Sequence, residues 1–450
     1  MAFVPAQRVA RAGAGVIALA PAMTAEGRGA PISGFALLYA TIFVMATGNL
    51  AMMSLFPAIA RSSGIPDVAM VAVQSASAGL SILAMPFWAA RSDRVGRKPV
   101  IVIGITGFAV ASALTAGAIY AAVHGLLSVA AGIAALVCAR AVFGSVGLAA
   151  APAIQALIAD ETAPARRTGA LASISSAQGI GSIVGPGIAP LLVLPWIGLA
   201  GPLVAFALVG CAVLVAVVAK LPRSEPPVCA ANALRKGSWH TLRRGSVLPY
   251  VAYLAVLSGC QAASLQMLGF VVIDRLRLGP LEAQPFAGIA MMLGAAAAVA
   301  VQLGIMRRIR VAPSRLMVAG SVLTVAGYVV MALAPSYALV VLAYVLSSAG
   351  GAFAIPAAAS GASLANPRDM QGTVAGLTTA ALSSGLLIAP VLAMLIYRHS
   401  PAGAFVSIAV AVAGVSTVLL PRLSGIPTLP AQSQDGVANE HPGGPLPPDM

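Results

Sequence analysis

The stretch Val100–Ala121 reads VIVIGITGFAVASALTAGAIYA and contains 22 residues without one charged side chain. A helix needs about 20 apolar residues to cross the hydrocarbon core of a bilayer. A membrane-spanning strand would instead alternate apolar and polar residues over about ten positions. The stretch therefore predicts a transmembrane helix, and it decides the fold class.

The same character extends over the whole chain of 450 residues, of which 59% are hydrophobic and only 8% charged. Soluble domains carry about 25% charged residues, so the composition excludes a set of soluble domains. Apolar runs bounded by charges or by Pro and Gly clusters predict an all-α membrane protein with twelve transmembrane helices. We expect the helices near 35–57, 69–89, 100–121, 128–158, 169–194, 202–218, 250–273, 285–306, 316–333, 337–364, 372–397 and 402–420.

The distribution of basic residues tests this topology. The formal net charge is +14, with 26 Lys and Arg residues. In twelve helices with both termini cytoplasmic, 21 of the 26 basic residues fall in cytoplasmic segments, as the positive-inside rule requires. We therefore interpret the positive charge as a topology signal rather than a nucleic-acid surface, and we predict a multi-pass protein of the bacterial inner membrane.

The chain also divides into two similar halves. GLAAAP at 147–152 and GAFAIP at 351–356 share their Gly and Pro at an offset of 204 residues. Chance is the alternative, since Gly and Pro are frequent in membrane helices. We expect six-helix halves in parallel repeat around a mid-membrane solute site. The predicted divisions are an amino-terminal tail (1–33), the first half (34–219), a cytoplasmic loop (220–248), the second half (249–420) and a disordered tail (421–450).

The loop RSDRVGRKP at 91–99 places five charged residues and a turn glycine between two predicted helices. Asp93 can pair with Arg94 or Arg97, and such contacts can form in one conformation and break in another. A solvated loop that only sets topology is an equally good interpretation of the residues alone.

This loop resembles the signature of the major facilitator superfamily, G-x-L-a-D-r-x-G-R-K/R-x. The matching residues are Asp93, Arg94, Gly96, Arg97 and Lys98, while Ala89 replaces the first glycine and Arg91 the leucine. The resemblance implies that Asp93 and Arg97 latch the outward-facing state and gate the rocking of the two halves.

Two helix motifs extend the resemblance. Arg140-Ala-Val-Phe-Gly144 is similar to the R-x-x-x-G motif of the family's fourth helix. In the fifth helix, the stretch 181–189 (GSIVGPGIA) resembles the exporter motif of the twelve-helix drug:proton antiporters, through Gly181, Gly185, Pro186 and Gly187. Independently of the family, these small residues permit close helix approach and the proline permits a bend.

Arg140 is the one ionised residue that the sequence places near the bilayer interior, where it costs at least about 2.5–3.5 kcal/mol. It can bind an anionic group of the solute, lie near a proton path or act as a packing strut. We expect it to contact the solute, together with four neutral polar residues in apolar helices: Asn49, Gln178, Gln261 and Gln266. Hydrogen bonding between helices is the alternative for each amide.

Acidic residues are scarce in the predicted helices, and none lies in the middle of an apolar run. The helix-1 segment 45–49 (MATGN) lacks the carboxylate that many similar exporters carry there. A site with an arginine and no carboxylate favours neutral or anionic solutes over cations. If protons are coupled, the available carriers are Asp67, Asp93 and Asp274.

From these residues we predict a secondary active transporter that exports small drug-like or toxic organic molecules by alternating access, in exchange for protons. The alternatives are an exporter of an endogenous anionic metabolite or metal chelator, and a membrane sensor that does not transport. We expect no enzyme activity, cofactor, metal site or nucleic-acid partner, and a monomer in the lipid bilayer.

Overall fold

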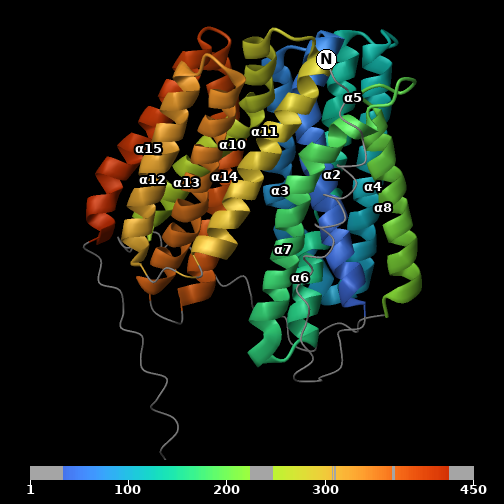
Figure 1. The fold of residues 1–450 in the computed structure, drawn as a ribbon. Coiled ribbons are helices and arrows are strands. Elements are labelled where there is room, and N and C mark those ends of the chain that lie inside the picture. Colours follow the sequence, from blue (N-terminus) through green and yellow to red (C-terminus); the bar gives the residue numbers. More distant parts are fainter. Residues whose placement is uncertain (1–33, 223–246, 307, 309–310, 367–369, 425–450) are drawn as a thin grey trace, which may run out of the picture.

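The computed structural model describes residues 34–222, 247–306, 308, 311–366 and 370–424. Every named element within them is a helix, and two clusters of long helices stand side by side (Figure 1). The first half contains α2 (Phe35–Ser63), α3 (Asp67–Val95), α4 (Arg97–Val123), α5 (Val129–Val142), the π-helix η1 (Phe143–Gly147), α6 (Ala150–Glu161), α7 (Pro164–Ile188), the 3₁₀-helix η2 (Ala189–Leu192) and α8 (Gly201–Lys220).

The second half contains α10 (Leu248–Leu276), α11 (Pro280–Ala300), the π-helix η3 (Val301–Ile305), α12 (Pro313–Leu333), α13 (Tyr337–Leu364), α14 (Gln371–Tyr397) and α15 (Pro401–Ser424). Counting α5, η1 and α6 as one interrupted crossing, each half has six membrane helices. The predicted twelve-helix, two-half fold is confirmed.

Eleven helices of the described chain are long and apolar enough to cross a membrane. The twelfth crossing is α7, which is rich in Ser and Gly and is therefore less hydropathic than the others. Its polar and small residues make it suited to contact with other helices rather than with lipid.

The observed bounds depart from the expected ones where proline or a wider helical turn intervenes. The first helix was expected to end at Pro57, but α2 continues to Ser63, because a membrane helix tolerates proline in its interior. The expected helix 128–158 is interrupted by the five-residue π-helix η1. By contrast, α13 has the expected bounds of 337–364.

Small residues set the spacing of helices within each half. A side chain on Gly107 of α4 would meet the backbone at Gly147 at 2.9 Å, and one on Gly327 of α12 would meet the backbone of α13 at Ser347 at 2.6 Å. Close backbone approach of this kind is the principal packing device of membrane helices. It makes each half a compact bundle.

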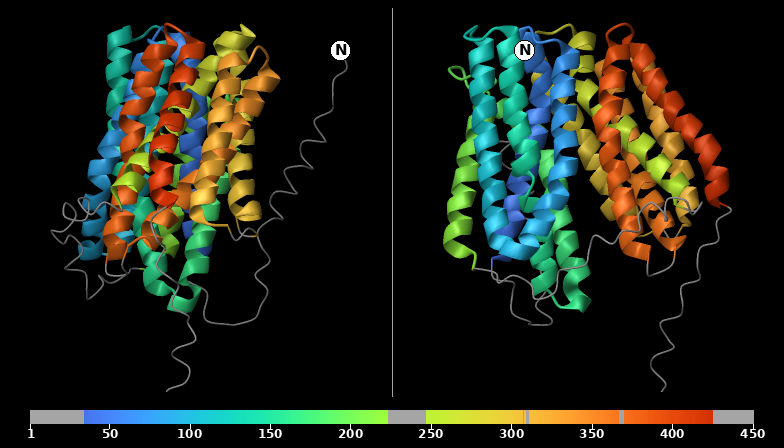
Figure 2. Two further views of the ribbon diagram at one scale, coloured as in Figure 1. Left: turned by 90° about the vertical axis from the view of Figure 1, so that its left-hand side faces the viewer. Right: turned by 180° about the vertical axis from the view of Figure 1, so that it is seen from behind.

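The two halves meet at one end and diverge toward the other (Figures 1 and 2). We call the end at which α2 terminates the closed end, and the end at which α2 begins the open end. Across the interface α11 packs on α2 and α7, and α14 packs on α3. Near the closed end, Gly269 of α10 lies against the ring of Pro57 in α2.

Candidate functional site

A cavity of about 300 Å³ lies between the two halves. Its walls come from α2 and α7 of the first half and from α10, α11 and α13 of the second half. Both halves therefore contribute to one solute-sized space, which is the arrangement expected for a site whose access alternates as the halves move.

The lining of this cavity is mostly apolar and carries no Asp, Glu, His, Lys or Arg among the described residues. Its polar groups are neutral: Ser182, Gln261, Gln302, Tyr344 and Ser348. The amide of Gln261 donates a hydrogen bond from Nε2 to the backbone carbonyl of Ser347 at 2.7 Å, which fixes its orientation. An apolar cavity with a few placed hydrogen-bonding groups suits a neutral organic solute.

The five residues expected to contact the solute lie in different places. Gln261 lines the cavity between the halves. Arg140 and Asn49 line a separate small cavity inside the first half. Gln178 is exposed on α7 outside the lining, and Gln266 has a buried Oε1 atom without a partner.

Gln302 is a lining residue that the sequence did not single out from the other amides. It lies in the π-helix η3, at the end of α11. Its signal in the sequence was the same as that of Gln261, an amide inside an apolar run. The face that each amide presents depends on helix packing and on the wider turn of η3, neither of which is readable from the chain.

The helix-4 motif forms a contact between crossings of the first half. A side chain on Gly144 would collide with the backbone of α3 at Ser77. Ser77 in turn donates a hydrogen bond from its hydroxyl to the carbonyl of Arg140 at 2.8 Å. The π-helix η1 begins three residues after Arg140, at Phe143, and such single π-turns are frequent at functional positions.

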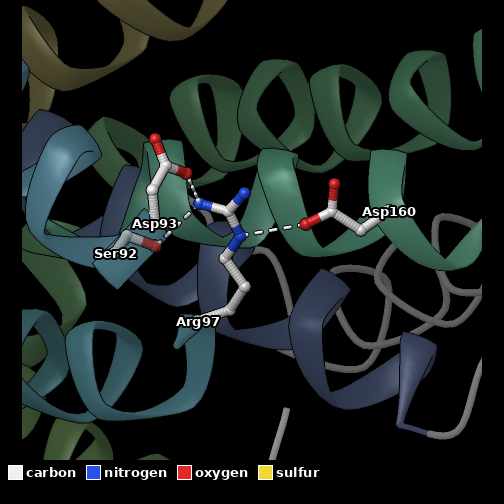
Figure 3. A network of polar contacts seen from close by, with 4 residues as sticks. All are labelled: Ser92, Asp93, Arg97 and Asp160. Carbon is white, nitrogen blue, oxygen red and sulfur yellow. Dashed lines mark hydrogen bonds and ion pairs between the residues drawn. The ribbon is translucent and has the colours of Figure 1, made fainter. Parts of the chain in front are cut away.

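The charged loop at the open end forms an ion-pair network within the first half (Figure 3). Arg97, at the start of α4, pairs through Nη1 with Asp93 at the end of α3. It also pairs through Nε with Asp160 near the end of α6, at 3.0 Å. The Arg97 side chain is only 8% exposed, so these contacts are partly shielded from water. The network ties three crossings together.

The neighbouring residues of the loop, Gly96, Lys98 and Arg94, lie in different surroundings. Gly96 joins α3 to α4 with φ 91° and ψ 162°, a conformation that favours glycine. Lys98 donates from Nζ to the carbonyls of Val218 and Leu221 at the end of α8, where a cation also complements the helix dipole. Arg94 is exposed.

The helix-5 motif contacts helices on both sides of the interface. Gly181 and Gly185 of α7 lie against the backbone of α2 near Thr47. Gly187 instead faces Met292 of α11, to whose Sδ an added Cβ would approach within 2.9 Å. The motif therefore packs α7 against α2 within the first half and against α11 of the second half.

At the closed end, an ion-pair cluster bridges the two halves. Arg61 of α2 pairs through Nη2 with Asp67 at 2.7 Å and, across the interface, with Asp274 of α10 at 3.2 Å. Tyr397 of α14 donates its hydroxyl proton to Asp274 Oδ2 at 2.8 Å. The guanidinium also lies over the ring of Phe270, 5.8 Å from its centroid.

Two of the three proposed proton carriers, Asp67 and Asp274, thus meet around one arginine, while Asp93 lies at the open end. In the part of the chain that the structure describes, no three His, Cys, Asp or Glu side chains gather as a metal site would require.

Two six-helix halves around a shared, neutral cavity define a membrane transporter rather than an enzyme. The chain belongs to the Major Facilitator Superfamily, whose family profile matches residues 37–390. This membership accounts for the signature loop and for the twelve-helix layout.

Solved structures of similar fold are transporters of varied solutes. A bacterial homolog of the human lysosomal transporter Spinster, inward-facing and unoccupied, has a TM-score of 0.71 at 12% identity, over 87% of this chain and 96% of that one. A point mutant of the nucleoside transporter NupG has a TM-score of 0.69 at 13% identity, over 86% and 99% of the two chains. At these identities the likeness extends to the fold alone.

Curated relatives match only a segment. The triacylglyceride transporter of Mycolicibacterium smegmatis is 35% identical over 105 residues, which are 23% of this chain and 17% of that protein. The probable triacylglyceride transporter of Mycobacterium leprae is 36% identical over 105 residues, covering 23% of this chain and 19% of its own length. The chain thus spans less than a fifth of the length of these relatives.

Proposed function

We propose that this chain exports neutral, lipophilic organic molecules by alternating access, in exchange for protons. The observation that carries the proposal is the lining of the cavity between the halves, where Gln261, Gln302 and Tyr344 offer hydrogen bonds within an otherwise apolar wall. A cationic or anionic solute would find no counter-charge among the described lining residues, and burying an unpaired charge is expensive.

The direction of transport rests on the exporter motif and on the basic loops. The excess of basic residues supports a cytoplasmic location for the open end under the positive-inside rule, and we propose that the termini face the cytoplasm of a bacterial inner membrane. An open cytoplasmic end loads solute from inside the cell, as export requires. The names of the mycobacterial relatives, triacylglyceride transporters, fit a lipophilic solute, although the match covers one segment only.

Alternating access requires that contacts at the closed end break as contacts at the open end form. In this conformation Arg61 holds Asp274 across the interface, whereas Arg97 pairs within its own half. We propose that the loop of Asp93 and Arg97 engages the second half once the open end shuts. When the halves part at the closed end, Asp274 separates from Arg61, and we propose this carboxylate as the proton carrier.

The test is proton flux in proteoliposomes that contain the full-length protein, an imposed pH gradient and an internal pH dye. Neutral, cationic and anionic lipophilic compounds of matched size are added in turn. We expect neutral compounds to drive proton exchange. Gln261→Leu should raise their KM about 3- to 10-fold by removing one hydrogen bond, while Gln178→Leu, outside the cavity, should leave it unchanged.

Each contrary result selects a different function. A preference for cations would contradict the argument from the neutral lining. A preference for anions that is lost in Arg140→Gln would favour the exporter of an anionic metabolite or chelator. Saturable binding without flux of any compound would indicate a sensor.

A further inference from the structure

Arg140 presents an electrostatic problem that the transport proposal leaves unsolved. Arg140 is only 3% exposed and lies inside the first half. Its Nε has no hydrogen-bond partner, and Nη1 reaches only the weak acceptor Met52 Sδ, at 3.6 Å. The guanidinium stays protonated in proteins, so a full positive charge is buried here.

Aromatic rings compensate part of that charge. The guanidinium lies 4.3 Å from the ring centroid of Phe143 and 5.9 Å from that of Phe56. In the described part of the chain, no carboxylate forms an ion pair with Arg140 within 4.0 Å. The acids of the first half lie at helix ends instead, at Asp67, Asp93, Asp160 and Glu161.

A small cavity of about 10 Å³ adjoins the guanidinium. Its polar lining consists of Arg140, Asn49, Ser112 and Thr115. The Oδ1 atom of Asn49 is buried and without a partner. Because the amide oxygen and nitrogen are assigned rather than observed, a rotation of the Asn49 amide directs its N–H donors into the same space. The two hydroxyls now donate to carbonyls of their own helix and can rotate.

The size of this cavity limits its occupant to one small particle, either a water or a monatomic anion. A polyatomic solute does not fit. A water would satisfy hydrogen bonds but leave the charge uncompensated. We propose that Arg140 and Asn49 bind a halide ion, chloride under ordinary conditions, as the buried counter-ion of the first half.

The site is distinct from the solute cavity. Asn49 and Met52 of α2 face the small cavity, whereas Leu50 of the same helix lines the larger one. The helix α2 therefore lies between the two spaces. A halide bound here acts on the packing of α2 against α4 and α5 and does not depend on which solute is carried.

The experiment measures the melting temperature of the purified full-length protein in detergent at constant ionic strength. Chloride or bromide replaces gluconate, which is too large for the cavity. We expect both halides to raise the melting temperature saturably, by roughly 2 °C or more, because they bind only the folded state. Arg140→Gln should abolish this dependence, and the matched change Arg275→Gln, at a helix end, should retain it.

Two further measurements test halide binding if the Arg140→Gln protein fails to fold. Asn49→Met fills the cavity with a longer, apolar side chain and should also abolish the halide effect. Crystals soaked in bromide should show an anomalous scattering peak beside the Arg140 guanidinium. Equal melting temperatures in gluconate and halide, halide effects that persist in both variants, or crystals without the bromide peak would each overturn the proposal.

Discussion

Arg97 is the residue on which the charged loop depends. Its guanidinium contacts Asp93 and Asp160 through two different nitrogens, and a lysine ammonium cannot reproduce this geometry. Sequence reasoning paired Asp93 with either Arg94 or Arg97. The structure selects Arg97 because it starts α4 and points inward, whereas Arg94 is exposed.

We expect Arg97→Ala to lower the free energy of unfolding of the first half by about 2 kcal/mol. Losing one partner of a buried pair costs more, but Asp93 and Asp160 are 30% and 46% exposed, and water screens them. Thermal melting in detergent measures the effect. Arg94→Ala in the same loop is the control, and an equal loss in both variants would refute a specific role of Arg97.

Gly96 supplies a second prediction for the same loop. Its backbone, at φ 91° and ψ 162°, is strained for any side chain, at a cost of order 1–3 kcal/mol. Gly96→Ala should therefore lower the melting temperature, while Gly117→Ala in α4, with open space around it, should not. Equal melting temperatures of the Gly96→Ala and Gly117→Ala proteins would show that the loop adopts another backbone conformation without strain.

The sequence identifies Arg140 as a lone ionised residue in an apolar run, but it does not show which cavity the side chain faces. The structure buries this side chain. Which space it faces depends on the rotation of α5 about its axis and on the wider turn of η1. The hydropathy pattern around Arg140 is uniformly apolar and fixes neither, so the sequence did not distinguish the small cavity from the solute cavity.

The small residues of α7 contact both α2 in the first half and α11 in the second half. Gly185 lies so close to the Thr47 carbonyl of α2 that any side chain must displace the backbone. We expect Gly185→Ala to destabilise the protein by about 1–3 kcal/mol and to reduce transport. The matched change Gly169→Ala, in the same helix with nothing within 4 Å, should be neutral or stabilising, since alanine favours helix. Detergent melting and flux assays measure both, and wild-type behaviour of Gly185→Ala would contradict the packing.

Helix positions were largely predictable because twenty apolar residues between charges leave few alternatives. The two π-helices were not predictable, since Phe143–Gly147 and Val301–Ile305 have the same apolar character as their surroundings. Each inserts a wider turn whose cause is tertiary packing. Gln302 lies within η3, so the sequence could place it on a helix but not on a face.

The arrangement of the two halves lay beyond sequence reasoning for a physical reason. A transporter has at least two stable arrangements of the same helices, and one chain encodes both. Asp67 and Asp274 were identified as residues at outer helix ends, but not as partners of one arginine. Asp274 reaches Arg61 only from the other half, so their meeting depends on how the two halves lie against each other at the closed end.

The closed-end cluster should bias this conformational equilibrium. The Arg61–Asp274 pair is about one-third exposed on each side and contributes about 1 kcal/mol, to which the contact with Phe270 adds a similar amount. Arg61→Ala should therefore increase the population parted at this end at least about fivefold. Asp274→Asn should act in the same direction more weakly, because Arg61 keeps its contact with Phe270 across the interface.

Distances between spin labels at Ser62 and His399, both exposed at the closed end, report this population in a background without the four native cysteines. The wild type should give mainly a short distance, and Arg61→Ala should add a longer one. Arg275→Ala, which removes another exposed charge at the same end, is the control. An unchanged distance distribution in Arg61→Ala would mean that packing of α7 on α11, rather than charge, holds the two halves together.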